Sequence, residues 1–444
     1  MMTKKILLLL SLTGSLLSHA ASLEVVGYFP SWSVADPVPF EINAQTISAA
    51  NLTVINYAFL DICWDGLHGN PAVTNKNDVH DCLDKQGEKI TPPNGSIVLG
   101  NPLWDADVHG RGKNNLAKLL ALKAVNPQLK LVASVGGWDW SNRFSLTARQ
   151  AQTRDNFSAS AVEFLRASGF DGIDIDWEFP TAIGVPCTPR QQCDDPDDKA
   201  NYVLLLQTLR HFVDRAGRED GKHYLLTIAA GSTPKFIHKT QSEAPWLAEL
   251  AHSVDWINLM NYDYHGPWES RAGLNSPLQS DALDLSETAV TTNAQAMVTL
   301  LLRYVPAQQL VLGVPFYGYS WPGCQPGAQQ DGLYQSCQQK TAAEDWSFTR
   351  LTTQGYLLLD EHGEHTRAGR GFTRYWNQDG AVPYLYNSLT RQFISYEDEQ
   401  SIHAKDFFIL QNGLRGAMFW ELNADREKIL GTVVAHDLLD QVIH

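Results

Sequence analysis

The sequence has a shortage of positive charge: 34 Lys and Arg residues stand against 49 Asp and Glu residues, for a net charge of −15. A broadly acidic surface repels phosphate backbones, so we expect no nucleic acid partner. After the first residues no apolar run is long enough to cross a membrane. No pair of cysteines has the C-x₂-C spacing of a zinc site. The sequence also contains no Ser/Pro-rich linker of the kind that joins a separate binding module to a catalytic domain. A neutral ligand remains compatible with this composition.

The first 20 residues have the pattern of a secretory signal peptide. Lys4 and Lys5 precede the apolar run 6–12, and Ser18-His19-Ala20 is a small-residue cleavage site. A membrane anchor is the alternative, but the apolar run is too short to span a bilayer. We therefore expect residues 1–20 to be removed and the protein to be secreted, into the periplasm or the medium.

Six cysteines fit export to an oxidising compartment. Six cysteines allow 15 pairings, which sequence alone does not separate. Because they fall as three local couples, each in a stretch rich in Gly, Pro or Asp, we predict the pairs Cys63–Cys82, Cys187–Cys193 and Cys324–Cys337.

Eight short β-rich runs recur along the chain, most of them continuously apolar, as is typical of strands covered on both faces in a parallel sheet. They span residues 24–29, 52–59, 129–136, 170–178, 224–230, 254–263, 309–316 and 414–420. Helical patterns lie between most of them, which predicts an α/β fold, a (β/α)8 TIM barrel. An open doubly wound sheet is the alternative. The long interval before the eighth run indicates an α+β subdomain at 319–383, inserted between barrel segments 21–318 and 384–444.

The stretch "FDGIDIDWEF", residues 170–179, places four carboxylates in apolar surroundings. Since alternate side chains of a strand share a face, Asp174, Asp176 and Glu178 point together into the barrel. Acids so close cannot all ionise easily, so at least one pKa rises. Glu178 lies at the carboxyl end of the strand, where barrel enzymes carry their chemistry, and a protonated Glu there is a general acid. A solvated acidic face and a calcium loop are the alternatives, and the interleaved Phe, Ile and Trp disfavour both.

This stretch resembles the D-G-x-D-x-D-x-E signature of family 18 glycoside hydrolases, the chitinases. Four further segments resemble the family in the same order: "GYFPSW" at 27–32, "SVGGW" at 134–138, "LMNYDYHGPW" at 259–268 and "AMFWELNAD" at 417–425. The likeness is greatest to the bacterial A-type chitinases, which also carry an insertion between strands seven and eight.

The resemblance implies hydrolysis of β-1,4 links between N-acetylglucosamine units of chitin, with retention, in which the N-acetyl group of the substrate is the nucleophile. The carboxylate spacing alone does not separate this route from one with an enzyme nucleophile. Glu178 would be the general acid and base, and Asp176 would accept a hydrogen bond from the acetamido N–H. Asp174 would share a proton with Asp176, and Tyr262 would donate to the acetamido oxygen.

The resemblance also implies a sugar site built largely from aromatic rings, which stack on the apolar faces of pyranoses. Trp420 would form its floor, Met260 and Asp263 would line the same subsite, and the expected walls and platforms are Tyr28, Gly137, Trp138, Phe179 and Trp268. By their placement near strand ends or in the insertion, we expect outer platforms among Trp32, Trp64, Trp321 and Trp376. One departure is visible: Tyr319 stands where A-type relatives usually carry Arg. No metal or cofactor is implied, the expected partners are chitin and its oligosaccharides, and we expect a monomer.

Two other functions share parts of this pattern. An endo-β-N-acetylglucosaminidase acting on the N-glycan core has the same acidic signature, but the insertion and the 13 Trp residues favour a chitinase. A non-catalytic chitin-binding lectin would typically lack the last acid of the signature, whereas Glu178, Asp176 and Tyr262 are all present.

Overall fold

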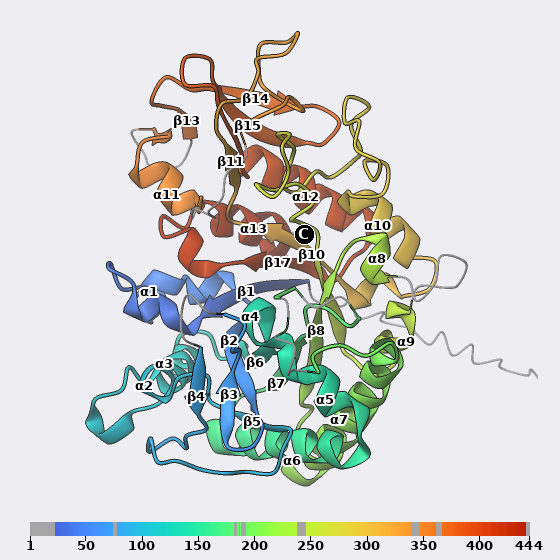
Figure 1. The fold of residues 1–444 in the computed structure, drawn as a ribbon. Helices are drawn as coiled ribbons and strands as arrows, with labels where there is room; N and C mark the ends of the chain where they lie inside the picture. Colours follow the sequence, from blue (N-terminus) through green and yellow to red (C-terminus); the bar gives the residue numbers. More distant parts are fainter. Residues whose placement is uncertain are drawn as a thin grey trace, which may run out of the picture.

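The computed structural model describes residues 23–73, 78–181, 184–185, 187, 192–237, 246–338, 346–360 and 366–440. Its centre is a closed barrel of parallel strands in the order β1-β17-β10-β9-β8-β7-β6-β2, and pairing of β1 with β2 closes it (Figure 1). The strands are β1 Glu24–Pro30, β2 Val54–Cys63, β6 Lys130–Gly136, β7 Gly172–Asp176, β8 Leu225–Gly231, β9 Trp256–Met260, β10 Leu310–Pro315 and β17 Gly416–Trp420. The predicted TIM barrel is confirmed, and each predicted β-rich run overlaps one of these strands.

Burial on both sides explains why these runs are apolar throughout. The outward side chains of β7, Ile173 and Ile175, join a large core cluster with helix residues such as Phe157 and Leu205. The inward side chains form a separate, smaller cluster inside the barrel, lined by Val26, Val54, Val132, Val311 and Met418. Alternate side chains along one strand thus enter two different environments, the interior of the barrel and the layer between the barrel and its helices.

The longer helices are α3 Asn115–Ala121, α6 Ala151–Ser168, α7 Asp198–Asp220, α10 Ala294–Leu301, α12 Glu399–Asn412 and α13 Ile429–Leu439. The shorter ones are α1 Ala44–Ile47, α2 Pro102–Asp105, α4 Gly137–Trp140, α5 Phe144–Arg149, α8 Pro234–Ile237, α9 Leu247–Ala251 and α11 Phe348–Thr353. Local residues determine several ends. Asn293 caps α10 by accepting from the Ala296 amide, and Gly169, at φ 77°, ends α6 just before the acidic strand.

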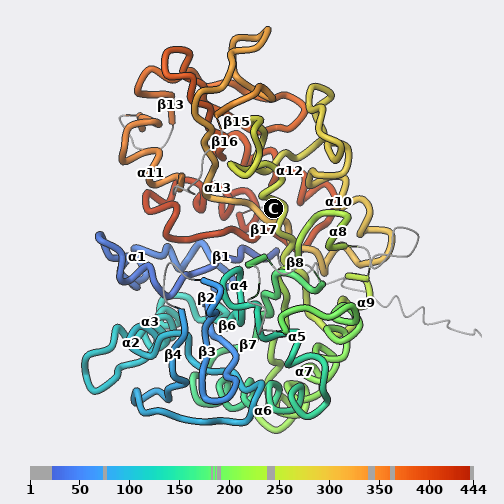
Figure 2. The backbone as a smooth tube through the Cα atoms, in the orientation of Figure 1, coloured from blue at the N-terminus to red at the C-terminus, as the bar shows by residue number. Residues whose placement is uncertain are grey.

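The segment between β10 and α12 contains a four-stranded antiparallel sheet in the order β11-β16-β15-β14. Its strands are β11 Tyr319–Trp321, β14 Thr373–Asn377, β15 Val382–Asn387 and β16 Gln392–Ser395, and a β12–β13 hairpin, Leu357–Leu359 with Thr366–Ala368, accompanies it. In Figures 1 and 2 the orange strands lie together to one side of the blue and green half of the barrel. The predicted boundary at residue 383 falls inside β15. Since β15 pairs with β16, and β16 with β11, the sheet continues to Ser395.

Disulfides join the three predicted pairs, Cys63–Cys82, Cys187–Cys193 and Cys324–Cys337, and all six cysteines are paired. The first links the end of β2 to an excursion that the sequence did not reveal. This excursion contains the hairpin β3 Leu67–Gly69 with β4 Val79–Asp81, and the strand β5 Ser96–Val98, which pairs antiparallel with β2.

The predicted signal peptide, residues 1–20, lies outside the described residues. Among the residues that are described, no helix is both long and apolar enough to cross a membrane.

A buried ion pair between α12 and the segment just before it is hydrogen-bonded to the segment that follows β9. Lys405 Nζ lies 2.6 Å from Glu397 Oε1 and donates to Ser276 Oγ at 3.0 Å, and both charged side chains are buried. The Ser276 hydroxyl in turn donates to the Asn261 carbonyl at 2.6 Å. This chain of contacts ends one residue before Tyr262, so it supports part of the predicted site.

We expect Lys405→Met to lower the free energy of unfolding by about 3–5 kcal/mol, because it leaves the Glu397 carboxylate buried without its cation. Guanidinium denaturation at neutral pH measures the change. Lys118→Met, at an exposed position on α3, is the matched control and should stay within about 0.5 kcal/mol of the parent. A loss for Lys405→Met as small as that of the control would contradict the role assigned to the pair.

Candidate functional site

The acidic row of β7 lies inside the barrel, as its alternation predicts. Asp174 and Asp176 are buried, and Glu178, two residues past the strand's end, is half-buried. Asp171, the fourth acid of the stretch, lies apart from the row. It forms an ion pair with Lys123 at 2.6 Å and accepts from the Leu131 amide.

Asp174 is surrounded by donors from four other strands. Its Oδ2 accepts from the hydroxyls of Tyr28 at 2.8 Å and Ser134 at 2.7 Å, and its Oδ1 accepts from Thr227 at 2.6 Å and Asn258 at 3.4 Å. Burial raises the pKa of Asp174, and these four hydrogen bonds oppose that rise. The donors occupy about the four acceptor positions that a carboxylate offers, which favours the anion at this position.

Asp176 has no such support. Its Oδ1 is buried and has no hydrogen-bond partner within the described part of the chain. Burial raises its pKa well above the usual range, and the neighbouring charges of Glu178 and Asp174 raise it further. An unpaired buried carboxyl oxygen is costly unless a proton or a ligand satisfies it. Asp176 is therefore the member of the row best suited to hold a proton or to meet a polar group of a ligand.

Glu178 is held through its backbone. Its amide donates to the Ser141 hydroxyl at 2.8 Å, and its carbonyl accepts from the Gly184 amide at 3.0 Å. Burial raises the pKa of the Glu178 carboxyl to about 8, and the charges of Asp263 and Asp139 contribute to the rise. Glu178 thus stays protonated at neutral pH, as a general acid must.

Two glycines bring the end of β6 close to this segment. Gly136 has φ 107°, and a Cβ there would meet the Asp176 carbonyl oxygen at 2.4 Å. Gly137 has φ 78°, and a Cβ there would meet the Phe59 ring at 2.4 Å. The Ser141 hydroxyl donates back to the Gly137 carbonyl at 2.8 Å, which ties α4 to the Glu178 amide. Both glycines are therefore required by close approach and by backbone conformation.

Tyr262, Met260 and Asp263 follow at the end of β9. The Tyr262 hydroxyl lies 3.9 Å from the Met418 sulfur, a weak acceptor, so its proton remains available to a stronger one. Met260 packs against the cluster inside the barrel. Tyr262 is within electrostatic range of Asp263, Asp176 and Glu178, and these carboxyls raise its pKa together with burial, which is the largest cause.

Trp420 ends β17 among other aromatic rings. It stacks on Phe59 with ring centroids 5.8 Å apart, and its ring is tilted against those of Tyr28 at 5.6 Å and Trp32 at 6.3 Å. Trp420 and Trp32 are partly exposed. They give the carboxyl end of the barrel an apolar surface beside the acids.

The other predicted aromatic residues differ in exposure. The side chains of Trp138 and Trp268 are 51% and 55% exposed, as platforms for a ligand would be. Trp138 packs over Gly184, and Trp268 meets the Tyr319 ring edge-on at 5.3 Å. Phe179 stacks on Phe236 with centroids 3.9 Å apart and borders a mostly apolar pocket.

Two predicted positions are wrong. Tyr28 is only 2% exposed, so it offers no open face to a sugar and instead donates its hydroxyl to Asp174. Trp321 is 1% exposed and lies in the core of the inserted sheet with Phe393, because its strand pairs with β16. It is not an outer platform.

The sequence patterns did not identify three residues that contribute to the site. Ser141 holds the Glu178 amide, Asp139 adds charge near Glu178, and Tyr317 donates to Asp263 at 2.6 Å. Asp139 and Ser141 lie within three residues of the segment 134–138, and Tyr317 directly follows the predicted strand run 309–316. Nothing in their spacing distinguishes them from ordinary loop residues, so only proximity to the motifs could have drawn attention to them.

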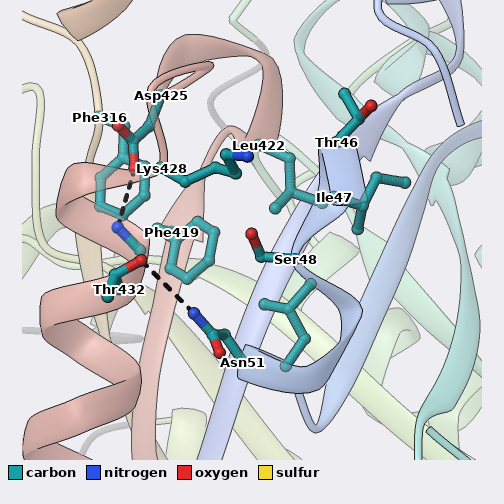
Figure 3. A pocket seen from close by; sticks show the side chains of 12 residues that line it. Thr46, Ile47, Ser48, Asn51, Phe316, Phe419, Leu422, Asp425, Lys428 and Thr432 are labelled. Atoms are coloured by element: carbon teal, nitrogen blue, oxygen red, sulfur yellow. Dashed lines mark hydrogen bonds between the residues drawn. The ribbon is translucent and has the colours of Figure 1, made fainter. Parts of the chain in front are cut away.

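One hollow of the molecule lies away from these acids, between α1, β17 and α13 (Figure 3). It holds about 330 Å³ of empty space, part of it open solvent, and its lining includes Phe316, Phe419, Ile47 and Asp425. The Asp425 carboxylate accepts hydrogen bonds from the amides of Ile429 and Gly431 in the first turn of α13, so its oxygens are already engaged. Among the described residues no group of three or more His, Cys, Asp or Glu side chains could hold a metal ion.

Comparison with known proteins gives a consistent result. The family model of glycosyl hydrolases family 18 matches residues 24–425. Chitinase A1 of Niallia circulans is 41% identical over 438 residues, covering 94% of this chain and 59% of that protein, so the chain spans less than two thirds of this relative. Two solved structures resemble the fold. Chitinase ChiA74 from Bacillus thuringiensis has a TM-score of 0.81 at 36% identity, covering 94% of this chain and 70% of its own. A family 18 N-acetylglucosaminidase from Paenibacillus barengoltzii has a TM-score of 0.70 at 30% identity, covering 94% and 100%.

We expect Tyr28→Phe to lower the free energy of unfolding by about 1.5–3 kcal/mol, because a buried, charge-assisted hydrogen bond to Asp174 is lost while the ring remains. Chemical denaturation at pH 7 measures it. In Tyr375→Phe the lost hydroxyl is exposed and donates at 3.4 Å to the Gln330 carbonyl, so the expected change is below about 0.5 kcal/mol. Equal losses in the two variants would show that the Asp174 network contributes nothing specific.

Proposed function

The chain belongs to glycosyl hydrolase family 18, and we propose that it is a secreted chitinase that cleaves β-1,4 links between N-acetylglucosamine units with retention. The observation that carries the proposal is the placement of two carboxyls at the carboxyl end of β7: the buried Asp176, whose Oδ1 has no partner among the described residues, and Glu178 two residues later, whose pKa burial raises to about 8. The names of the relatives support chitin as the substrate class.

In the first half of the reaction, Glu178 donates its proton to the glycosidic oxygen as the bond from that oxygen to C1 breaks. The carbonyl oxygen of the sugar's own acetamido group attacks C1 and forms an oxazolinium ion. Asp176 accepts the acetamido N–H through its free Oδ1, which orients the carbonyl and offsets the positive charge that develops. Tyr262 donates its hydroxyl to the acetamido oxygen and holds it in line for attack.

In the second half, the Glu178 carboxylate removes a proton from a water molecule as that water attacks C1. The oxazolinium ring opens, the acetamido group is restored, and Glu178 is protonated again for the next cycle. Two displacements at C1 leave its configuration unchanged. Asp174, two residues before Asp176 on the same face of β7, shares a proton with Asp176, and its charge is one of the causes that raise the pKa of Asp176.

The surrounding rings provide the sugar surface. Trp420 is the floor of the subsite in which the acetamido group reacts, while Trp138 and Trp268, both exposed, are platforms further along the chain of sugars. Met260 and Asp263 line the same subsite as Tyr262. The three disulfides suit an oxidising compartment, which supports secretion after removal of residues 1–20. We propose that the protein acts as a monomer.

We expect Glu178→Gln to lower kcat on chitohexaose by about 10²–10⁴-fold, since the amide cannot donate and recover a proton, while binding of the hexamer is retained. Product analysis and calorimetric titration measure the two quantities. Glu163→Gln, at an exposed position on α6, should match the parent.

The same assays separate the other functions. Binding of the hexamer without turnover by the parent protein would identify a lectin. Release of N-glycans from a glycoprotein, with chitohexaose left intact, would identify an endo-β-N-acetylglucosaminidase. Full turnover by Glu178→Gln would remove Glu178 from its role.

We expect the rate on chitohexaose to fall as pH rises through about 8. The pKa of Glu178 is raised, so the acid is protonated below that pH and loses its proton above it. A profile of kcat against pH from 5 to 10 tests this. An alkaline limb centred near pH 5 would mean that Glu178 has the pKa of an ordinary exposed carboxyl.

A further inference from the structure

The Asp263 carboxylate is held by two phenols. Its Oδ1 accepts from the hydroxyl of Tyr317 at 2.6 Å and from that of Tyr319 at 2.7 Å. Its backbone is also restrained: Asp263 has φ 60°, its amide donates to Asn275 Oδ1 at 2.9 Å, and Asn275 donates to the Tyr317 carbonyl at 3.3 Å. Asp263 therefore has a defined position in a strained backbone conformation.

Tyr319 brings the inserted subdomain into this arrangement. It is the first residue of β11 and pairs with Ser395 of β16. Its ring meets the edge of Trp268 at 5.3 Å and that of Tyr317 at 5.6 Å. One side chain thus links the subdomain sheet, an exposed aromatic ring and the carboxylate after β9.

Asp263 in turn acts on Glu178. Titratable groups from several elements lie within electrostatic range of the Glu178 carboxyl: Asp176 on the same segment, Asp139 of α4, Asp263 and Tyr262 after β9, and Tyr319 of β11. Burial is the largest cause of the raised pKa of Glu178, and among the neighbouring charges that of Asp263 contributes most. Burial raises the pKa of Asp263 itself, and the hydrogen bonds from the Tyr317 and Tyr319 hydroxyls oppose that rise without adding a positive charge.

We propose that Tyr319 is a positioning residue for the reaction: together with Tyr317 it fixes the Asp263 carboxylate next to Tyr262 with neutral donors alone, so that the negative charge of Asp263 is not offset by a cation and helps Glu178 to keep its proton. This rests on the proposed function, because it assumes that Glu178 is the general acid. It gives Tyr319, at a position where the resembling enzymes usually carry a cation, a role other than contact with the sugar.

The test is a comparison of Tyr319→Arg with Tyr319→Phe. A guanidinium beside Asp263 offsets its charge, so Tyr319→Arg should shift the alkaline limb of the kcat profile to lower pH by at least about half a unit; a direct cation neighbour shifts a carboxyl pKa by roughly 1–3 units, and here the effect passes through Asp263. Tyr319→Phe keeps the ring and adds no charge. The alkaline limb of its kcat profile should therefore move by less than half the shift seen in Tyr319→Arg.

A second readout does not depend on turnover. In protein labelled with ¹³C at the glutamate carboxyls, the resonance absent from Glu178→Gln reports the titration of Glu178, and its midpoint should fall in Tyr319→Arg. If the parent cleaves no chito-oligosaccharide, the proposed function fails, while this titration still tests Tyr319.

The matched control is Tyr384→Phe. The Tyr384 hydroxyl donates to Asp331 at 2.7 Å within the same inserted sheet, so the substitution removes an equivalent bond between a phenol and a carboxylate outside the site. The alkaline limb of its kcat profile and the titration midpoint of its Glu178 should match those of the parent. The proposal is overturned if Tyr319→Arg leaves both midpoints unmoved, if Tyr319→Phe moves them as far, or if Tyr384→Phe moves them at all.

Discussion

Three carboxyls in a row along β7 and the two residues after it cannot all be ionised easily, and the rest of this site follows from that constraint. In a medium of low dielectric constant, each added negative charge raises the cost of the next. Hydrogen-bond donors are distributed unequally along the row, so its members differ. Asp174 has four donors, Asp176 has one oxygen with none, and Glu178 stands at the rim, where its pKa is about 8.

The closed barrel makes this inequality possible. The donors to Asp174 come from β1, β6, β8 and β9, and inward side chains from so many strands converge on one point only when the sheet is closed. Interior positions that aliphatic side chains would otherwise fill are occupied by a phenol, two hydroxyls and an amide. Aliphatic side chains fill other positions of the barrel interior, among them Val26, Val54 and Val132.

The elements beyond the barrel act at the rim. Ser141 of the segment after α4 holds the Glu178 amide, and the inserted sheet contributes Tyr319 to Asp263. The buried pair of Lys405 and Glu397 supports the segment before Tyr262 from the side of α12. The barrel therefore supplies the row of acids, while the surrounding loops and the subdomain set the position and the charge of the groups that face it.

The sequence by itself determined what depends on local pattern. Period-two alternation put Asp174, Asp176 and Glu178 on one face, continuous apolar runs located the eight strands, and local spacing identified the disulfide pairs. Only the tertiary structure decided which distant groups meet. It brought the Tyr28 hydroxyl to Asp174, buried Trp321, extended the inserted sheet past residue 383, and joined Tyr319 to Asp263. The reason is physical: a strand's alternation is set by its own backbone, whereas hydrogen-bond partners and burial are set by side chains that the fold brings together from tens or hundreds of residues away.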